Sequence, residues 1–397
     1  TTINNEQKKL NVPNLRFPEF QGEWKKCKLE ELSNKITRKN KGNAIQNVLS
    51  NSATLGLIPQ NEYFDREIAN SNNTDSYYVI EYGDFVYNPR KSVSAPYGPV
   101  NIYTGNIKGI ISPLYLCFSV HSILPSFLYY RFKSPAWFPY VYSHGDMGTR
   151  FDRVSIKDDV FFGMPIYMPS QKEQKKISHL MSLLDKRIAT QNKIIEDLKK
   201  LKSAIIEIEY TPNTKTTSHI GNVIEQISKR NKNNAIQNVL SVSNRQGFIK
   251  QSDQFENRNV ASEDTSNYKI VEKNDFAFNP ARINVGSIAR LTTFEKGIVS
   301  PMYICFRTQG NVASEYIDFF FESKHFYCEI QKRLEGSVRQ CLSFEGLCNI
   351  PFSLPSLEMQ QRIGKRLFTL GQKIKTETDL LELLNKQKQY LLRQMFI

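Results

Sequence analysis

The chain has 397 residues, of which 40% are hydrophobic, enough to build two or three domains with separate cores. Lysine and arginine outnumber aspartate and glutamate by 53 to 39, so a polyanionic partner is favoured, with nucleic acid ahead of an acidic membrane surface. A basic protein that owes only its solubility to this charge is the alternative. The sequence has no apolar run of roughly eighteen residues and no secretory signal at its start, so we expect a cytoplasmic protein with no membrane partner.

The six cysteines are expected to be reduced thiols of the core. They form no C-x-x-C pair and have no histidine at metal-ligand spacing, and this argues against a disulfide or a metal site. They are Cys27, Cys117, Cys305, Cys328, Cys341 and Cys348.

A tandem duplication organises the chain. The octapeptide NAIQNVLS occurs at 43–50 and again at 234–241, a displacement of 191 residues. Two further pairs follow in the same order: GDFVYNP and NDFAFNP, then GIISPLYLCF and GIVSPMYICF. Chance does not produce such a series, so each half of the chain is one structural unit.

Each half is expected to begin with a mixed α/β domain, over 1–168 with an N-terminal extension and over 211–354. Short alternating or apolar runs broken by Gly, Asn and Pro predict strands, for example at 77–80 and 268–271. Some helix is expected as well, around Ser126–Arg131 and Ser314–Phe321.

A long helix is predicted after each domain, over 169–210 and 355–397. Ser170 and Glu173 have the spacing of a capping box, and Pro212 is expected to end the first helix. A helix of about 38 residues spans on the order of 57 Å.

Both helices carry the seam of a coiled coil. Apolar residues recur in steps of four and three from Ile177 onward and from Ile363 onward. Gln191 and Glu377 interrupt the seam at equivalent places, 186 residues apart. Such polar residues either fix the register or mark a hydrated stretch, and the sequence does not separate these readings.

The short linker at 210–218 places the end of the first helix beside the start of the second. If the seams pack together, the helices must run antiparallel, with the domains at opposite ends of a rod. The expected fold class is α+β: two similar mixed α/β domains separated by an antiparallel coiled coil, with a pseudo-twofold internal repeat.

The halves differ where a reading surface would differ. Between the repeated Asn-Pro and Ser-Pro dipeptides the first half has 23 steps and the second 20, and the segments begin with unlike basic, amide and hydroxyl side chains. Arginine can bond guanine edges, asparagine can bond adenine, and serine can bond bases or phosphates. Ordinary variable surface loops would also differ in this way.

Two further surfaces are candidates, one after each octapeptide and one at a late turn in each domain. At the late turns, glycine and a small hydroxyl residue allow close approach to phosphate while arginine supplies charge, although turn chemistry alone could explain the glycines. The candidate DNA-binding residues of the three surfaces are Asn51, Asn88, Arg90, Lys91, Ser92, Tyr97, Arg150, Ser243, Asn244, Arg245, Asn279, Arg282, Asn284, Arg290, Arg339 and Gln340.

Catalytic motifs are missing from the sequence. It has no phosphate-binding G-x-x-x-x-G-K-[ST] loop, no H-E-x-x-H helix and no Gly-rich dinucleotide fingerprint. Arg90 and Ala281 stand where the Asn-Pro-Pro-aromatic motif of amino-methyltransferases has its second proline. We therefore expect a chain that is not an enzyme and binds no cofactor and no metal itself.

Three features together resemble one known family. They are the opening segment VPNLRFPEF at 12–20 with Gly22 and Trp24, the paired blocks described above, and a Pro-Ser dipeptide before a Gln-rich helix start in both halves. Over nearly its whole length the chain resembles the specificity subunits of Type I restriction-modification enzymes.

The resemblance implies two target-recognition domains, each reading one part of a split, asymmetric site in double-stranded DNA, with the two helices as a ruler for the unread spacer. It implies two methyltransferase subunits that carry S-adenosylmethionine and flip the target adenine. It also implies restriction subunits that translocate with ATP and Mg²⁺. Apolar helix residues beyond the seam would dock the methyltransferases or belong to the chain's own core: Leu183, Ile194, Ile206, Leu380 and Leu383.

Two other functions remain open from the residues alone. One is a stand-alone, two-domain regulatory or architectural DNA-binding protein. The other is a coiled-coil scaffold whose duplicated domains bind protein.

Overall fold

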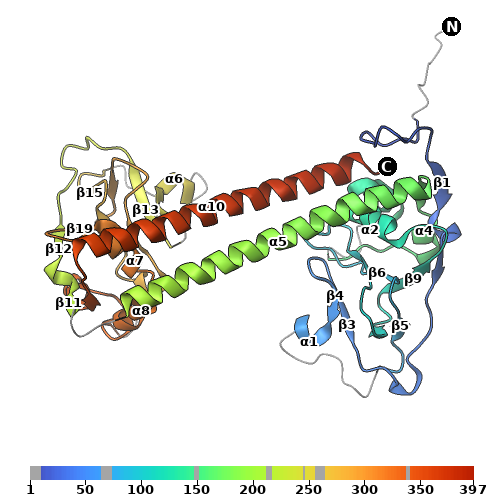
Figure 1. The fold of residues 1–397 in the computed structure, drawn as a ribbon, viewed down its shortest axis with the longest axis horizontal. Coiled ribbons are helices and arrows are strands. Elements are labelled where there is room, and N and C mark those ends of the chain that lie inside the picture. Colours follow the sequence, from blue (N-terminus) through green and yellow to red (C-terminus); the bar gives the residue numbers. More distant parts are fainter. Residues whose placement is uncertain are drawn as a thin grey trace, which may run out of the picture. The chain divides into compact units, whose positions relative to one another are not determined.

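The computed structural model describes residues 10–63, 74–146, 152–211, 217–244, 246–254, 264–336 and 340–397. These residues form two compact units (Figure 1). The first unit takes the described residues up to Thr190 together with Leu380–Ile397, and the second is Gln191–Asp379. Each unit therefore contains one α/β domain and a part of both long helices.

The first domain is built from one four-stranded antiparallel sheet and three strand pairs. The sheet has the order β2-β9-β6-β7, made of β2 (Ser33–Lys35), β9 (Leu116–Val120), β6 (Phe85–Tyr87) and β7 (Val100–Ile102). The pairs are β3 (Leu49–Ser52) with β4 (Gly56–Pro59), β5 (Tyr78–Ile80) with β8 (Gly109–Ile111), and β1 (Lys25–Lys28) with β10 (Pro165–Met168).

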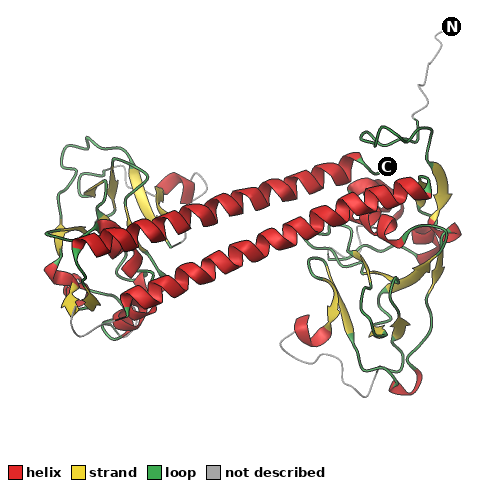
Figure 2. Cartoon of the chain, viewed as in Figure 1, coloured by secondary structure: helices red, strands yellow, loops and turns green. Residues whose placement is uncertain are grey.

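The second domain repeats this topology. Figure 2 shows the strands in yellow and the helices in red. Its first sheet has the order β12-β19-β16-β17, made of β12 (Ile224–Ile227), β19 (Ile304–Thr308), β16 (Phe276–Phe278) and β17 (Ile288–Arg290). Its second has the order β14-β13-β18-β15, made of β14 (Gly247–Lys250), β13 (Val239–Ser243), β18 (Lys296–Val299) and β15 (Lys269–Glu272). The remaining pair is β11 (Thr217–His219) with β20 (Pro351–Ser353).

The duplication extends to the strand register. Val239 and Ile298 face each other in the parallel pair of β13 and β18, and Val48 and Ile110 form an isolated parallel bridge at the equivalent place. The repeated blocks of the sequence are therefore repeated structure, as the tandem duplication predicts.

Short helices cover the sheets, and two long helices follow the domains. The α-helices are α1 (Gln60–Tyr63), α2 (Pro125–Lys133), α3 (Phe138–His144), α4 (Asp158–Phe162), α5 (Gln171–Tyr210), α6 (Gln251–Gln254), α7 (Ser314–Phe320), α8 (Lys324–Gln331), α9 (Phe344–Cys348) and α10 (Leu357–Gln394). The 3₁₀ turns are η1 (Leu29–Glu31), η2 (Lys41–Asn43), η4 (Pro135–Trp137), η5 (Ile220–Asn222) and η6 (Ile283–Val285). The predicted strands at 77–80 and 268–271 correspond to β5 and β15, and the predicted short helices to α2 and α7.

The long helices begin where the sequence predicts, directly after each Pro-Ser dipeptide, and α5 ends two residues before Pro212. The hydroxyl of Ser170 accepts a hydrogen bond from the Glu173 N–H at 3.3 Å. The Glu173 carboxylate binds the Arg16 guanidinium through two contacts of 2.8 Å and accepts from Trp24 Nε1 at 3.3 Å. The helix start thus holds the opening segment of the chain against the first domain.

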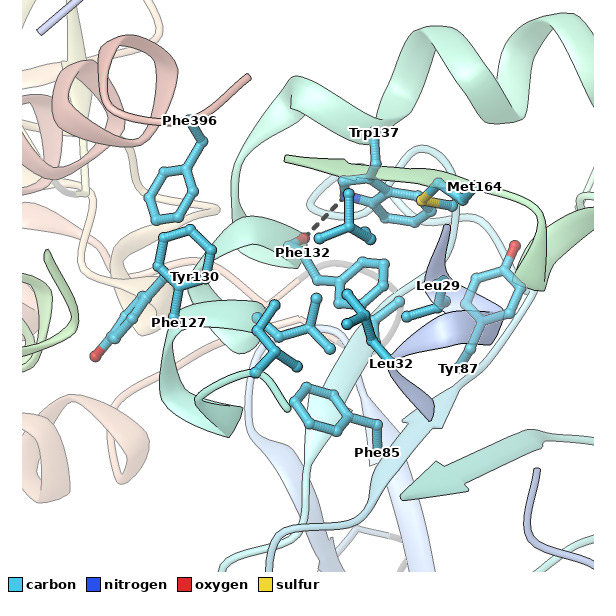
Figure 3. Packing of buried hydrophobic residues seen from close by; sticks show 14 of the residues in the cluster. Leu29, Leu32, Phe85, Tyr87, Phe127, Tyr130, Phe132, Trp137, Met164 and Phe396 are labelled. Atoms are coloured by element: carbon cyan, nitrogen blue, oxygen red, sulfur yellow. Dashed lines mark hydrogen bonds between the residues drawn. The ribbon is translucent and has the colours of Figure 1, made fainter. Parts of the chain in front are cut away.

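An aromatic core fills the first unit (Figure 3). The rings of Phe85 and Phe118 stack with centroids 5.2 Å apart, and Trp137 Nε1 donates to the Phe132 carbonyl at 3.0 Å. Phe396, near the chain end, packs on Phe127 with centroids 5.4 Å apart. The start of α5 and the end of α10 are therefore parts of this core.

The second unit uses the opposite helix ends in the same way. Ile205 and Ile206 near the end of α5 lie in one buried cluster with Ile363 and Leu367 near the start of α10. Burial of such side chains contributes about 1.5–3 kcal/mol each. In each unit, therefore, the beginning of one long helix packs in the same core as the end of the other.

The two polar seam residues contact each other in the second unit. Gln191 is buried, and its Nε2 donates to the Glu377 carboxylate at 2.5 Å and to its carbonyl at 3.0 Å. Lys373 also binds this carboxylate, and the hydrogen bonds from Lys373 and Gln191 lower the pKa of Glu377. A direct polar pair favours the register role over a hydrated seam.

Three of the cysteines, Cys27, Cys117 and Cys305, are buried as expected. Burial raises the pKa of Cys117 and of Cys305 to about 12, which keeps these thiols protonated and unreactive. Cys328 is exposed, which corrects its assignment to the core; it lies on α8, where only one side of the helix faces the domain interior.

A glutamine in the first turn of each long helix joins that helix to its domain. Gln174 Oε1 accepts from the Leu124 N–H at 2.8 Å, and Gln360 Oε1 accepts from the Ala313 N–H at 2.9 Å. The amide nitrogen of each donates to the carbonyl of the proline that precedes the helix, at 2.9 and 2.8 Å. Both side chains are 1% exposed, and we call each arrangement a glutamine latch.

We predict that Gln174→Ala lowers the free energy of unfolding of the first unit by about 1–3 kcal/mol, because it leaves the buried Leu124 N–H unpaired. Both tryptophans, Trp24 and Trp137, lie in the first unit, so urea unfolding of the full chain followed by tryptophan fluorescence reports on it. Gln171→Ala in the same turn is the control, because Gln171 is exposed. Equal losses of unfolding free energy for the two variants would show that the glutamine latch does not stabilise the first unit.

Candidate nucleic-acid interface

The repeated Asn-Pro turn is built identically in both domains. Asn88 Oδ1 accepts from the N–H of Arg90 at 3.0 Å, and Asn279 Oδ1 accepts from the N–H of Ala281 at 3.1 Å. An asparagine that bonds the main chain two residues on fixes such a turn. Each turn follows a central strand, β6 or β16, so the segment after it leaves both domains at the same place.

The copied octapeptide supports the loops rather than forming one of their tips. Asn40 and Asn231 are buried, and each bonds the main chain of the isoleucine five residues on, through its Oδ1 and its Nδ2, at 2.9–3.1 Å. Within the octapeptide, Asn43 and Asn234 have left-handed φ angles of 52° and 49°, which asparagine tolerates well. Asn40 and Asn231 stand three residues before each octapeptide, and this repetition is the sequence signal for their role.

The first loop presents two candidate side chains to solvent. Arg90 and Ser92 are exposed, and the Ser92 hydroxyl accepts from the N–H of Ala95 in a tight turn at 3.1 Å. Lys91 is half-buried. Tyr97 is half-buried as well, with its ring 4.8 Å from that of Phe138. Arg90 and Ser92 are therefore best placed to reach a ligand.

The corresponding loop of the second domain presents Arg282 and Asn284, both exposed. A Cβ atom added to Gly286 in this loop would lie 3.8 Å from the Cβ of Asn244, which is exposed in the turn between β13 and β14. Ser243 is half-buried at the end of β13. Two of the three candidate surfaces thus form one continuous surface in this domain.

The described residues that follow each late turn adjoin the Asn-Pro turn in both domains. The Val154 N–H donates to the Pro89 carbonyl at 2.9 Å, and the Leu342 N–H donates to the Pro280 carbonyl at 3.1 Å. Gln340, two residues before Leu342, is exposed. The candidates Arg150, Arg245 and Arg339 lie outside the described residues.

Two candidate asparagines are buried. Asn51 is 5% exposed, donates to the Val86 carbonyl at 2.9 Å and accepts from Asn101 at 2.6 Å. Asn279 is 7% exposed, and Asn88, its counterpart, is half-buried. Burial corrects the placement of Asn51 and Asn279 on an exposed reading surface, and we assign both to the support of the loops.

Arg290 is also an internal residue. Its side chain is 7% exposed and forms ion pairs with Glu315 at 2.7 Å and with Asp318 at 3.1 Å. Burial raises the pKa of Asp318, and the guanidinium of Arg290 opposes that effect. The structure therefore corrects the placement of Arg290 among the loop tips, because it lies on β17 and faces α7.

Within the described ranges, no group of three or more His, Cys, Asp or Glu side chains is arranged to hold a metal ion. The helices of the described ranges also lack the combination of length and apolar character that crossing a membrane requires.

Comparison with known proteins identifies what these domains are similar to. Residues 205–386 match the family model of the Type I restriction modification DNA specificity domain. A Methanocaldococcus jannaschii protein, named as the type I restriction enzyme MjaX specificity subunit, is 24% identical over 326 residues, which are 74% of this chain and 71% of that protein.

Two solved structures share the fold. One is the S subunit of a Type I restriction-modification system from M. genitalium, with a TM-score of 0.56, 15% identity and coverage of 97% of this chain and 99% of that chain. The other comes from a study of complex assembly and conformational transition of the type I R-M system, with a TM-score of 0.54, 14% identity and coverage of 93% and 96%. The family resemblance seen in the sequence is confirmed.

We predict that Arg290→Ala destabilises the second domain by about 2 kcal/mol, because it removes charged hydrogen bonds to Glu315 and Asp318. Amide hydrogen exchange in β16 and β17 measures this local loss. Arg282→Ala, at an exposed position, is the matched control and should stay within about 0.5 kcal/mol. A larger loss for Arg282→Ala than for Arg290→Ala would reverse the assignment of the two side chains.

Proposed function

We infer that this chain, a specificity subunit of the Type I restriction-modification family, selects the DNA sequence on which its complex acts. Each α/β domain reads one half of a bipartite, asymmetric site. One observation carries this proposal: the two domains have the same hydrogen-bonded frame around the Asn-Pro turn but expose unlike side chains beyond it. These are Arg90 and Ser92 in the first domain and Arg282 and Asn284 in the second.

The chemistry of these tips suits base recognition. A bidentate arginine discriminates for guanine and an asparagine for adenine by about 1–3 kcal/mol per good contact. The net charge of +14 supports phosphate contacts, which add affinity without sequence preference and weaken with salt. Because both domains belong to one chain, the second half-site binds at high effective concentration, and each domain can be weak alone.

The chemistry of methylation and cleavage belongs to partners in this proposal. Two methyltransferase subunits supply S-adenosylmethionine and the reacting base pocket, and restriction subunits supply ATP-driven translocation with Mg²⁺. Of the apolar helix residues beyond the seam, Leu183, Ile194 and Leu383 are exposed, which supports a docking role. Ile206 is core and Leu380 is half-buried, so neither has the exposure that docking requires.

The two long helices set the spacer between the half-sites in this proposal. Helix α5 has 40 residues and α10 has 38, which correspond to lengths of about 60 and 57 Å. In support, each unit buries the beginning of one helix with the end of the other, as an antiparallel pair requires. The Gln191–Glu377 pair would keep the register of this ruler.

The function is tested by reconstituting the chain with its methyltransferase subunits and mapping the methylated adenines on genomic DNA. We expect one bipartite motif with a fixed spacer. Tight binding of one DNA word by the chain alone would favour a stand-alone regulator. Failure to bind DNA even with the methyltransferases would favour a protein-binding scaffold.

We predict that Arg282→Ala relaxes recognition at the second half-site only, at a cost of about 1–3 kcal/mol of discrimination against the wrong base. Arg90→Ala is the matched variant and should relax only the first half-site. Competition binding of the complex to sites mutated in one half measures both. An equal loss for all DNA sequences would instead make Arg282 a phosphate contact.

We also predict that four residues, about one helical turn, inserted at the same seam level in both α5 and α10 lengthen the preferred spacer and leave both half-site words unchanged. Methylome sequencing of cells that carry the modified complex measures words and spacer together. Changed half-site sequences with the original spacer length would contradict the proposal that the helices set the spacer.

A further inference from the structure

A cavity with two lysines in its wall lies beside the loop of the first domain that follows the Asn-Pro turn and carries Arg90 and Ser92, which we call the reading loop. Its volume is about 260 Å³, and all of its lining residues belong to the first unit. The wall includes Thr54 of the β3–β4 turn and Ser94 of the segment that carries Arg90 and Ser92. Lys133, the last residue of α2, and Lys388 of α10 complete it.

Lys133 is tied to the frame of the reading loop. Its Nζ donates to Asn101 Oδ1 at 2.6 Å, and the Asn101 amide donates to Asn51 Oδ1 at 2.6 Å. Asn51 lies on β3, which leads into the turn at Thr54. An unbroken polar chain therefore joins the ammonium group in the cavity to the base of the loop.

Lys388 has an acidic partner and Lys133 has neutral ones. Lys388 Nζ lies 2.5 Å from Asp185, which also accepts from the Tyr130 hydroxyl at 2.8 Å. The described contacts of Lys133 are the Asn101 amide and the ring of Tyr129, with Nζ 5.0 Å from the ring centroid. Among these contacts the one carboxylate, Asp185, pairs with Lys388, so the two ammonium groups together keep a net positive charge.

In the second domain, an ion pair occupies the equivalent position. The displacement of 186 residues that relates the two helices maps Lys202 onto Lys388. Leu124 and Ala313 both donate to a glutamine latch, and their displacement of 189 residues maps Lys133 onto Glu322. Lys202 Nζ binds both oxygens of Glu322, at 2.6 and 2.9 Å.

The two asparagines of this polar chain have apolar counterparts in the second domain. Asn101 faces Val86 in the strand register, and its counterpart Ala289 faces Ala277. Val242 stands at the place of Asn51, 191 residues later. In the second domain, therefore, Glu322 neutralises Lys202. In the first domain, lysines occupy both equivalent positions, Lys133 and Lys388.

Holding Lys133 in this position has an electrostatic cost. Burial, together with repulsion from Lys388, lowers the pKa of Lys133 to about 8, and the charge of Asp185 only partly opposes this shift. A bound anion would offset both effects, because an opposite charge stabilises the ammonium form. The cavity thus has the charge and the donors that an anion needs.

We propose that this cavity binds a phosphate of the DNA backbone beside the first half-site, between Lys133 and Lys388. The proposal rests on the proposed function. DNA is the occupant that the geometry favours, because the cavity opens among the loop segments that carry the base-reading candidates Arg90 and Ser92. An acidic side chain of a methyltransferase subunit is the competing occupant, and the test distinguishes it.

Lys133→Glu tests the proposal because it copies the Lys202–Glu322 ion pair of the second domain. Lys133→Met, which removes the charge but keeps the aliphatic stem, is the second variant. In the complex with methyltransferase subunits, we expect DNA affinity to fall roughly ten- to a hundredfold, the loss of a charged hydrogen bond. We expect the slope of log affinity against log salt to shrink by roughly 0.9, the value for one phosphate. The methylated sequence should not change.

Lys172→Glu, at an exposed position in the first turn of α5, controls for net charge. Assembly with the methyltransferases is measured in parallel by sedimentation. Wild-type affinity and salt slope in both Lys133 variants would overturn the proposal, and so would lost assembly with DNA binding retained. If the unmodified complex lacked sequence-specific binding, the proposed function would fall as well.

Discussion

In both units one buried glutamine amide fixes how the start of a long helix meets its domain, in addition to the apolar core that they share. Gln174 and Gln360 each accept a main-chain N–H from the domain and donate to the proline that precedes the helix. An unpaired buried N–H costs about 1–3 kcal/mol, so the helix start cannot slide or rotate against the domain without losing these bonds. The loop that follows each Asn-Pro turn is therefore held in place relative to the beginning of its helix, and the proposed ruler role of the helices depends on this.

The copied octapeptide and the Asn-Pro turns belong to the support of the loops, and the exposed tips beyond them differ between the two halves. The octapeptide is copied letter for letter because it includes an asparagine in the left-handed region and lies against the buried Asn40 or Asn231. The side chains that differ, such as Ser92 and Asn284, are exposed. The proposed reading of two half-sites would need this division, since a change in the support would move every contact, whereas a change at one tip would alter only one contact.

Repeats, residue periodicity and turn residues in the sequence were enough to predict the duplication, strands β5 and β15, and the limits of the long helices. They also marked Gln191 and Glu377 as a pair of equivalent polar positions. They could not predict which way a side chain on a strand faces. Asn51 and Arg290 have the chemistry of base-reading residues, but β3 turns Asn51 towards Asn101, and β17 turns Arg290 towards the carboxylates of α7. Glu173 likewise has capping-box spacing, yet its carboxylate holds Arg16 from a segment 157 residues away. Such choices depend on partners that are distant in sequence.

Two domains with the same backbone fold can still carry different charges at equivalent positions. This is seen where α2 meets the end of α10 in the first unit and where α7 meets the end of α5 in the second. The second domain closes this contact with the Lys202–Glu322 pair, in which both charges are satisfied within the protein. The first domain replaces the glutamate by Lys133 and supports it with Asn101 and Asn51, polar groups whose burial is tolerated only because they bond one another. For the stability of the isolated domain, an ion pair would serve better than a buried polar chain that ends in an excess positive charge. The proposed phosphate would give this excess charge its partner, so the two domains differ in electrostatics as well as in their exposed tips.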